Sequence, residues 1–199
     1  MSGKCSQAAM MECDWQHVVL LLSRMERELL KPEVVTFSTA ISSCGSCDRW
    51  REALELFERC DADVIAFNAA ISACEKGGWE VAFHLLNLLK LRSLRENLTT
   101  YNSILSVCGR SREWQRALEL FSSLQLRDVI SYNACITACG QVSQWQHALF
   151  LMSELGAQGA ADVVTCSASI DAFSNASLWQ LALLTFFQAP VRKNVLSSA

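Results

Sequence analysis

The chain has 199 residues, of which 51% are hydrophobic and 19% charged, and its formal net charge is -3. This composition supplies enough apolar side chains for a sizeable core and excludes intrinsic disorder and low-complexity sequence. A weakly acidic chain has no overall positive field, which counts against a strong non-specific nucleic-acid binder.

The tryptophans reveal an internal repeat. Their separations are 35, 29, 35, 31 and 34 residues, for Trp15, Trp50, Trp79, Trp114, Trp145 and Trp179. Aligning the chain on them predicts a partial repeat, five full repeats and the start of a truncated one. The boundaries are 1–33, 34–63, 64–97, 98–128, 129–162, 163–194 and 195–199.

Each full repeat is predicted to be a helical hairpin. Apolar residues at positions 1, 4, 8 and 11 form one face of a first helix, as Val34, Phe37, Ile41 and Cys44 do in the first full repeat. A second amphipathic helix begins near each tryptophan. We expect Gly45, Gly109 and Gly140, just past the first helix, to supply left-handed cap residues.

One hairpin cannot bury both apolar stripes alone, so neighbouring hairpins must stack. The predicted fold class is therefore all-α, an α-solenoid superhelix of stacked helix-turn-helix repeats. The segment 15–33 is expected to be the second helix of an earlier repeat.

A polar stripe adjoins the apolar face of the first helices. Position 5 holds Ser38, Asn68, Asn102, Asn133 and Ser167, and position 9 holds Ser42, Ser72, Ser106, Thr137 and Asp171. Short amide and hydroxyl groups can read base edges, one base per repeat, and apolar side chains can sandwich the bases. The candidates for sandwiching are the position-2 residues Val35, Ile65, Thr99, Ile130 and Val164.

The simplest alternative is that these polar residues are only the solvated side of amphipathic helices. Asparagine is a poor residue for a helix interior, so its recurrence at position 5 of three repeats favours base reading.

The opening V-[VI]-x-[FY]-N and the later W-x-x-A-L-x-L-F make the repeats resemble the pentatricopeptide repeat (PPR) family. Tetratricopeptide repeats have a similar period but carry tryptophan on the first helix. The departures from the PPR pattern are the short repeats, one residue missing before Trp79, and Cys166 and Ser167 in place of an aromatic residue and asparagine.

The resemblance implies that position 5 and the last residue of each repeat together choose the base. The last residues are Asp63, Asn97, Asp128, Asp162 and Asn194. Carried over, these pairs imply single-stranded RNA with the site 5′-G-Y-U-U-A-3′. The family is chiefly organellar, so the resemblance implies a mitochondrion or a plastid. No targeting segment is visible, and a cytoplasmic location stays open.

Position 13 offers Lys76 and Arg110 as phosphate contacts. Arg110 also belongs to a locally basic sequence, since residues 88–118 contain six basic and two acidic residues. Ion pairing on a solvated face is the alternative role for the arginines away from position 13.

We expect no catalysis, cofactor, metal, membrane or small-molecule substrate. Cys44-x-x-Cys47 has metal-ligand spacing, but Cys44 occupies a repeated core position, and no catalytic motif occurs. The leading hypothesis is an RNA-binding protein that occupies a site or delivers an RNA-processing enzyme. A protein-binding scaffold and an adaptor region of a larger RNA-processing enzyme are the alternatives.

Overall fold

The computed structural model describes residues 15–25, 27–28 and 33–188, and the regular secondary structure in these ranges is entirely helical. The chain divides into two compact halves, Met1–Ser103 and Ile104–Ala199, and each is described by itself. The division falls within α6 (Leu98–Arg110). Among the described helices, none is long and apolar enough to cross a membrane.

The helices begin at the residues where the repeats and their tryptophans were aligned in the sequence. In the first half a helical segment, 15–25, precedes α2 (Val34–Ser46), α3 (Trp50–Arg59), α4 (Val64–Ala73), the short 3₁₀ helix η1 (Cys74–Lys76) and α5 (Trp79–Leu91). In the second half follow α7 (Trp114–Ser123), α8 (Val129–Gln141), α9 (Trp145–Ala157), α10 (Val163–Asn175) and α11 (Trp179–Gln188). Each second helix from α3 to α11 thus begins at its tryptophan.

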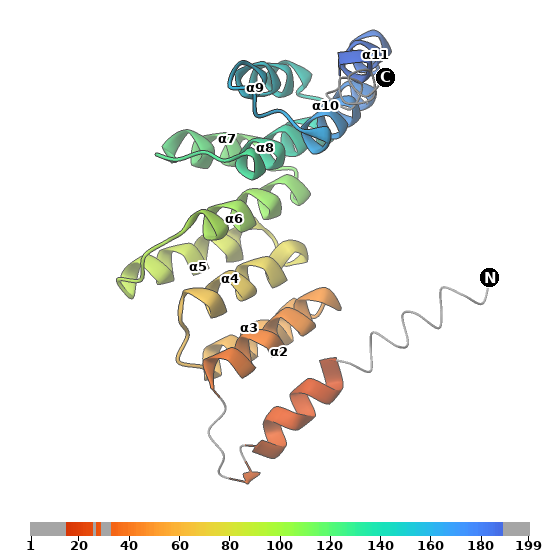
Figure 1. Ribbon diagram of the computed structural model, residues 1–199. Helices are drawn as coiled ribbons and strands as arrows, with labels where there is room; N and C mark the ends of the chain where they lie inside the picture. Colours follow the sequence, from red (N-terminus) through yellow and green to blue (C-terminus); the bar gives the residue numbers. More distant parts are fainter. Residues whose placement is uncertain (1–14, 26, 29–32, 189–199) are drawn as a thin grey trace, which may run out of the picture. The chain divides into compact units, whose positions relative to one another are not determined.

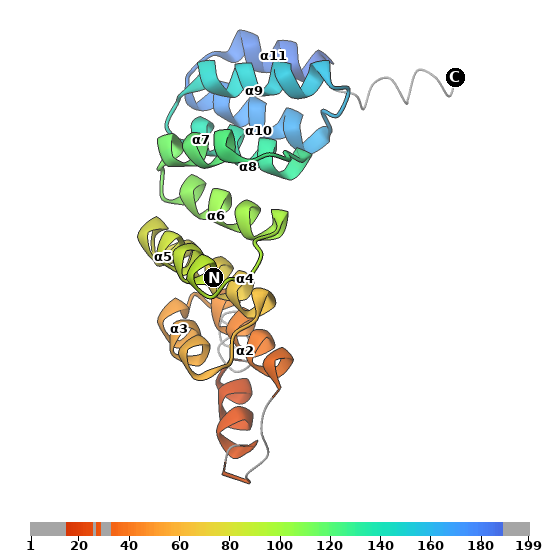
Figure 2. The ribbon, with the colours of Figure 1, turned by 90° about the vertical axis from the view of Figure 1, so that its left-hand side faces the viewer.

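The hairpins of each half stack in the same way. In the first half α2 packs on its own second helix α3 and on the next first helix α4, as Figure 1 shows. In the second half α8 packs in the same manner on α9 and α10, and α10 packs on α11 (Figure 2). This repeated packing of helical hairpins is the α-solenoid architecture.

Aromatic contacts recur at equivalent joints between repeats. The rings of Phe57 on α3 and Phe67 on α4 meet edge to face, with centroids 4.8 Å apart. Phe121 on α7 and Tyr132 on α8 repeat the same distance in the second half. Full burial of such a side chain contributes about 1.5 to 3 kcal/mol, so each joint supplies core that a single hairpin lacks.

The predicted glycine caps are wrong. Gly45, Gly109 and Gly140 lie inside α2, α6 and α8, and the residues with positive φ come three positions later, at Asp48, Arg112 and Ser143. Gly45 and Gly140 instead allow close contact with the next first helix. A Cβ on Gly45 would lie 2.8 Å from the Cβ of Ala73, and one on Gly140 would lie 2.8 Å from the Cβ of Ala172.

The first helices end in a Schellman motif two residues before the tryptophan helix. The Arg49 N–H donates to the Cys44 carbonyl and the Asp48 N–H donates to the Gly45 carbonyl. The sequence is one residue shorter before Trp79. There the chain forms η1, and Gly78, with φ of 100°, leads directly into α5.

Two glycine substitutions should have opposite effects on stability. Gly140→Ala is expected to lower the free energy of unfolding by about 1 to 3 kcal/mol, because the new methyl group overlaps Ala172. Gly109→Ala is the matched control, since its Cβ would lie at an ordinary 3.5 Å from Ala138. It should raise stability by about 0.5 to 1 kcal/mol. Urea unfolding followed by circular dichroism measures both, and equal effects would contradict the close-contact explanation.

Candidate nucleic-acid interface

Exposed aliphatic side chains occur at position 2 in the first turn of four first helices. Val35 is 65% exposed, Ile65 and Ile130 are each 63% exposed, and Val164 is 59% exposed. Thr99 occupies the same position in α6 and is also exposed. The structure thus places the predicted sandwiching residues on the surface. Apolar side chains at one repeated surface position can provide flat contacts for planar groups.

In the second half, the position-5 asparagine belongs to a hydrogen-bonded cluster. The hydroxyl of Thr165, at position 3 of the next repeat, lies 2.7 Å from Asn133 Oδ1 and 2.9 Å from Asp162 Oδ1. Asn133 Nδ2 approaches the same carboxylate oxygen at 3.5 Å. We call Asn133, Asp162 and Thr165 the repeat-4 cluster. It joins two predicted reading residues to a threonine that the sequence reasoning did not select.

The first half contains the same arrangement, the repeat-2 cluster, formed by Asn68, Asn97 and Thr100. The Thr100 hydroxyl lies 2.7 Å from Asn68 Oδ1 and 2.9 Å from Asn97 Oδ1. Asn68 Nδ2 donates to Asn97 Oδ1 at 3.4 Å. The two threonines are fully buried, whereas the two position-5 asparagines are partly exposed. Each cluster therefore contains a buried threonine hydroxyl and a partly exposed asparagine amide.

The other predicted reading residues lie in different surroundings. Ser38 is only 7% exposed and donates to the Val35 carbonyl, and Ser167 is exposed and donates to the Val163 carbonyl. Asn102 is partly exposed. Asn194 lies outside the described residues.

In the described part of the chain, the last residues of the four repeats from 34–63 to 129–162 also cap the next first helix. Asp63, Asp128 and Asp162 accept from the backbone N–H of Ala66, Ser131 and Thr165, respectively. Asn97 accepts from the Thr100 N–H at 2.9 Å. Sequence reasoning missed this role, although Asp or Asn directly before an apolar-periodic helix is the usual sign of an N-cap.

Capping affects the charge of Asp162. The backbone N–H of Thr165 and the Asn133 amide donate to the Asp162 carboxyl and lower its pKa below its ordinary value despite some desolvation. The carboxylate therefore stays ionised at neutral pH and remains an acceptor beside the Asn133 amide.

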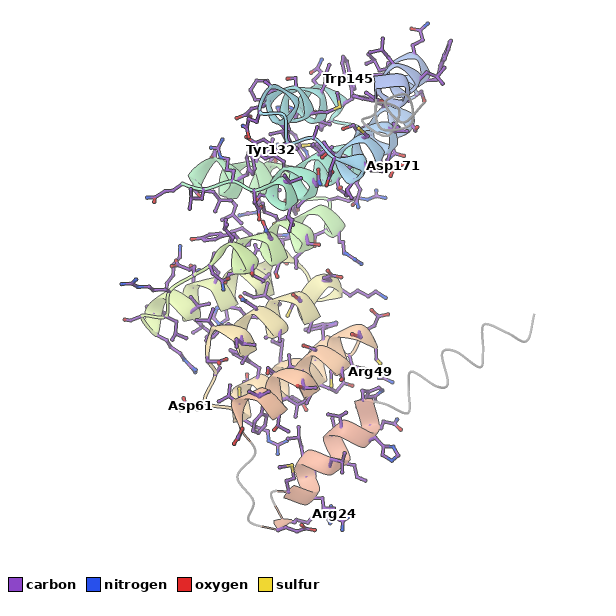
Figure 3. The ribbon with its side chains drawn as sticks, viewed as in Figure 1. Arg24, Arg49, Asp61, Tyr132, Trp145 and Asp171 are labelled. Carbon is purple, nitrogen blue, oxygen red and sulfur yellow. The ribbon has the colours of Figure 1, made fainter. Side chains whose placement is uncertain are left out.

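The position-9 side chains follow the same helix faces. Ser42, Ser72, Thr137 and Asp171 are exposed, and Ser106 is partly buried. Figure 3 shows Asp171 on α10. In the first half Ser72 also donates to Ser103 of the next first helix at 3.2 Å, so part of this polar stripe belongs to the joints between repeats.

The predicted phosphate contacts already have protein partners. Lys76 pairs with Asp48 on the surface. Arg110 is exposed at the end of α6 and has further interactions of its own. Lys90 pairs with Glu96 at 3.6 Å, and Arg92 lies over the Phe67 ring at 5.7 Å. Part of the basic sequence is thus paired with a carboxylate or packed on an aromatic ring.

The cysteine series belongs to the core. Burial is the main reason that the pKa values of Cys44, Cys74, Cys108 and Cys139 are raised to about 11, so these thiols are protonated at neutral pH. In the described ranges no group of three or more His, Cys, Asp or Glu residues is placed to hold a metal ion. His147 instead packs against Trp114, with ring centroids 5.0 Å apart.

Two family profiles match this chain. The profile described as PPR repeat matches residues 35–61, 99–129 and 130–159, and the profile described as pentatricopeptide repeat domain matches residues 58–111. Together they cover residues 35–159 without a gap. No curated protein sequence matches the chain.

Solved structures share the fold. The pentatricopeptide repeat protein PPR10 from maize aligns with a TM-score of 0.69 and 22% identity over 93% of the chain and 28% of its own length. Its complex with an 18-nt psaJ RNA element aligns with a TM-score of 0.72 and 22% identity over 91% of the chain and 29% of its own length. Nuclear proteinaceous RNase P 2 from A. thaliana gives a TM-score of 0.58 at 9% identity over 79% of the chain and 38% of that protein. The chain spans less than a third of the maize protein.

The capping geometry predicts how Asp162 tolerates substitution. Asp162→Ala should lower the free energy of unfolding by about 1 kcal/mol, because the Thr165 N–H loses its acceptor. Asp162→Asn should remain close to the wild type, since Asn97 forms the same cap in this chain. Thermal and urea unfolding compare the two variants. An equal loss of stability in both would show that charge, rather than the capping bond, is what matters.

Proposed function

Because the chain belongs to the pentatricopeptide repeat family, we propose that it is a sequence-selective single-stranded RNA-binding protein that reads about one base per repeat. Position 5 and the last residue of each repeat contact the base edge. The exposed position-2 side chains sandwich the base. Lys76 and Arg110 contribute phosphate contacts. The proposed site is 5′-G-Y-U-U-A-3′, from the repeat at 34–63 to the repeat at 163–194.

The observation that carries this proposal is the recurrence of the asparagine cluster beside an exposed aliphatic side chain. Asn68 and Asn133 hold the same position relative to Ile65 and Ile130, three residues earlier on one helix. An amide offers both a donor and an acceptor, and it pairs well with the donor and acceptor groups of a pyrimidine edge. A solvated face with no ligand does not require this combination twice.

The proposed pairs differ in their chemistry. Beside Asn133 stands the carboxylate of Asp162, which can only accept, so it suits the N3–H of uracil. Beside Asn68 stands the amide of Asn97, whose oxygen is held by the Thr100 N–H and whose nitrogen can donate. This pair suits a pyrimidine that offers an acceptor. Ser38 with Asp63 is proposed to read guanine, Asn102 with Asp128 uracil, and Ser167 with Asn194 adenine.

The biological role proposed for the protein is RNA processing, stability or translation in a mitochondrion or plastid, through site occupancy or delivery of an enzyme. It needs no cofactor and no catalytic residue in this chain. A five-base site recurs about once in a thousand nucleotides, so this segment addresses a single transcript only together with further recognition.

A protein-binding scaffold is the second candidate. The net charge of -3 and the pairing of Lys76 and Lys90 with carboxylates favour it, because strong RNA binders usually present unpaired basic groups. The two functions differ in their response to loss of the position-5 amides.

RNA titration tests the proposed function directly. The protein should bind a G-Y-U-U-A oligonucleotide with an affinity that falls as salt rises, by about 0.7 log units per tenfold salt for each neutralised phosphate. Asn102→Ala with Asn133→Ala should weaken binding about tenfold for each lost amide. Fluorescence anisotropy with labelled RNA measures both effects.

The control is Gln146→Ala, on the exposed surface of the second helix α9, which should leave the affinity unchanged. If the double asparagine variant binds RNA as tightly as this control does, the asparagines do not read bases.

Exchanging the last residues should exchange base preference. Asp162→Asn gives the repeat at 129–162 the Asn–Asn pair of the repeat at 64–97, so its preference for uracil at the fourth nucleotide should fall. Asn97→Asp should create a uracil preference at the second nucleotide. Both substitutions retain the N-cap, so the folded structure is preserved. Competition among oligonucleotides that differ only at these nucleotides measures the preference, and an unchanged ranking in both variants would contradict the assignment.

A further inference from the structure

A position-5 amide can face a base in two ways. Rotation of the asparagine side chain by half a turn exchanges Oδ1 and Nδ2 at nearly unchanged shape, and so exchanges an acceptor for a donor. A reader that rotates freely accepts two hydrogen-bond patterns and discriminates poorly. Selectivity therefore requires a group that distinguishes the two ends of the amide.

The repeat-4 cluster contains such groups. Asp162 can only accept, so the end of Asn133 that faces it at 3.5 Å must be Nδ2. The Thr165 hydroxyl lies 2.7 Å from the other end and donates to Oδ1. Half a turn would place Oδ1 against the carboxylate, acceptor against acceptor. The orientation is thus set from two sides, one of which belongs to the next repeat.

In the repeat-2 cluster, the last residue is itself an amide, and Thr100 orients both amides. Its backbone N–H holds Asn97 Oδ1 at 2.9 Å, which makes this atom an acceptor facing Asn68 Nδ2. Its hydroxyl lies 2.7 Å from Asn68 Oδ1. Thr100 and Thr165 are fully buried, so neither can contact RNA itself.

In the sequence too, asparagine at position 5 is paired with a hydroxyl residue at position 3 of the next repeat. The repeats with asparagine at position 5, at Asn68, Asn102 and Asn133, are each followed by a hydroxyl residue at position 3 of the next repeat, at Thr100, Ser131 and Thr165. Ser38 is followed by Ala66, and its hydroxyl donates within its own helix to Val35.

We propose that Thr100 and Thr165 are positioning residues, whose buried hydroxyls fix the amide orientation of the preceding repeat and thereby determine its base selectivity. This inference rests on the proposed RNA-binding function. It makes base choice at a repeat depend on three residues from two repeats.

Thr165→Val tests this proposal, because valine keeps the shape and removes the hydroxyl. The preference for uracil over cytosine at the fourth nucleotide should fall about threefold to tenfold, as expected for one lost hydrogen bond. The preference at the second nucleotide, read by Asn68, should not change. Thr165→Ser should retain the wild-type preference at both nucleotides. Thr100→Val should lower the preference for a pyrimidine over a purine at the second nucleotide and leave the preference at the fourth unchanged.

A purely structural role predicts something different. Thr165 also accepts from the Asp162 N–H at 3.3 Å as part of the capping box, so valine can lower stability. A role limited to capping would weaken binding to every oligonucleotide by the same factor and leave the uracil-to-cytosine ratio unchanged. This result would overturn the proposal.

A second measurement does not need RNA. In the free protein, the side-chain amide NMR signals of Asn133 should shift or broaden in Thr165→Val, while those of Asn68 stay in place, and Thr100→Val should do the opposite. Unmoved Asn133 signals in Thr165→Val would overturn the proposal. If the signals respond but the wild type binds no RNA, the oriented amide is retained and the proposed RNA-binding function fails.

Discussion

The close packing of one first helix on the next is the constraint on which the rest of this fold depends. At one end of the helices it needs the missing Cβ of Gly45 or Gly140, against Ala73 or Ala172. At the joint of α8 and α10, about seven residues away, or roughly 10 Å along the helix, the same close packing lets the Thr165 hydroxyl reach Asn133 of the preceding repeat. Larger residues along this contact would separate the two helices and, with them, the members of the repeat-4 cluster.

Much of the fold was predictable from the sequence, because helix periodicity and the tryptophan spacing are local signals. The first helices begin at Val34, Val64, Leu98, Val129 and Val163, and the second helices begin at the tryptophans. The glycines were misinterpreted because glycine permits both a left-handed cap and a close helix contact, and only the position of the neighbouring helix decides between them. The burial of Ser38 likewise depends on packing that periodicity does not describe.

The candidate site was less predictable, since it lies at joints between repeats. Position 5 and the exposed aliphatic residues could be found because each lies on one helix face. Thr100 and Thr165 could not, because their partners are 32 residues away in sequence.

The last residues of the repeats show how one side chain can have two roles. Asp162 caps α10 through Oδ1, and the same oxygen accepts from Asn133, so helix capping holds the carboxylate beside the amide.

This sharing changes what a repeat means in functional terms. Capping favours Asp, Asn, Ser or Thr as the last residue, which limits that position to a few side chains, whereas position 5 varies between serine and asparagine. The hydroxyl at position 3 comes from the next hairpin, so a boundary drawn before Leu98 or Val163 separates an amide from the group that orients it. If the proposed function holds, the physical unit of recognition is therefore the joint between two hairpins. A hairpin moved to a new neighbour keeps its position-5 asparagine. On the proposed mechanism, the amide of that asparagine keeps its orientation only if the new neighbour supplies a hydroxyl at position 3.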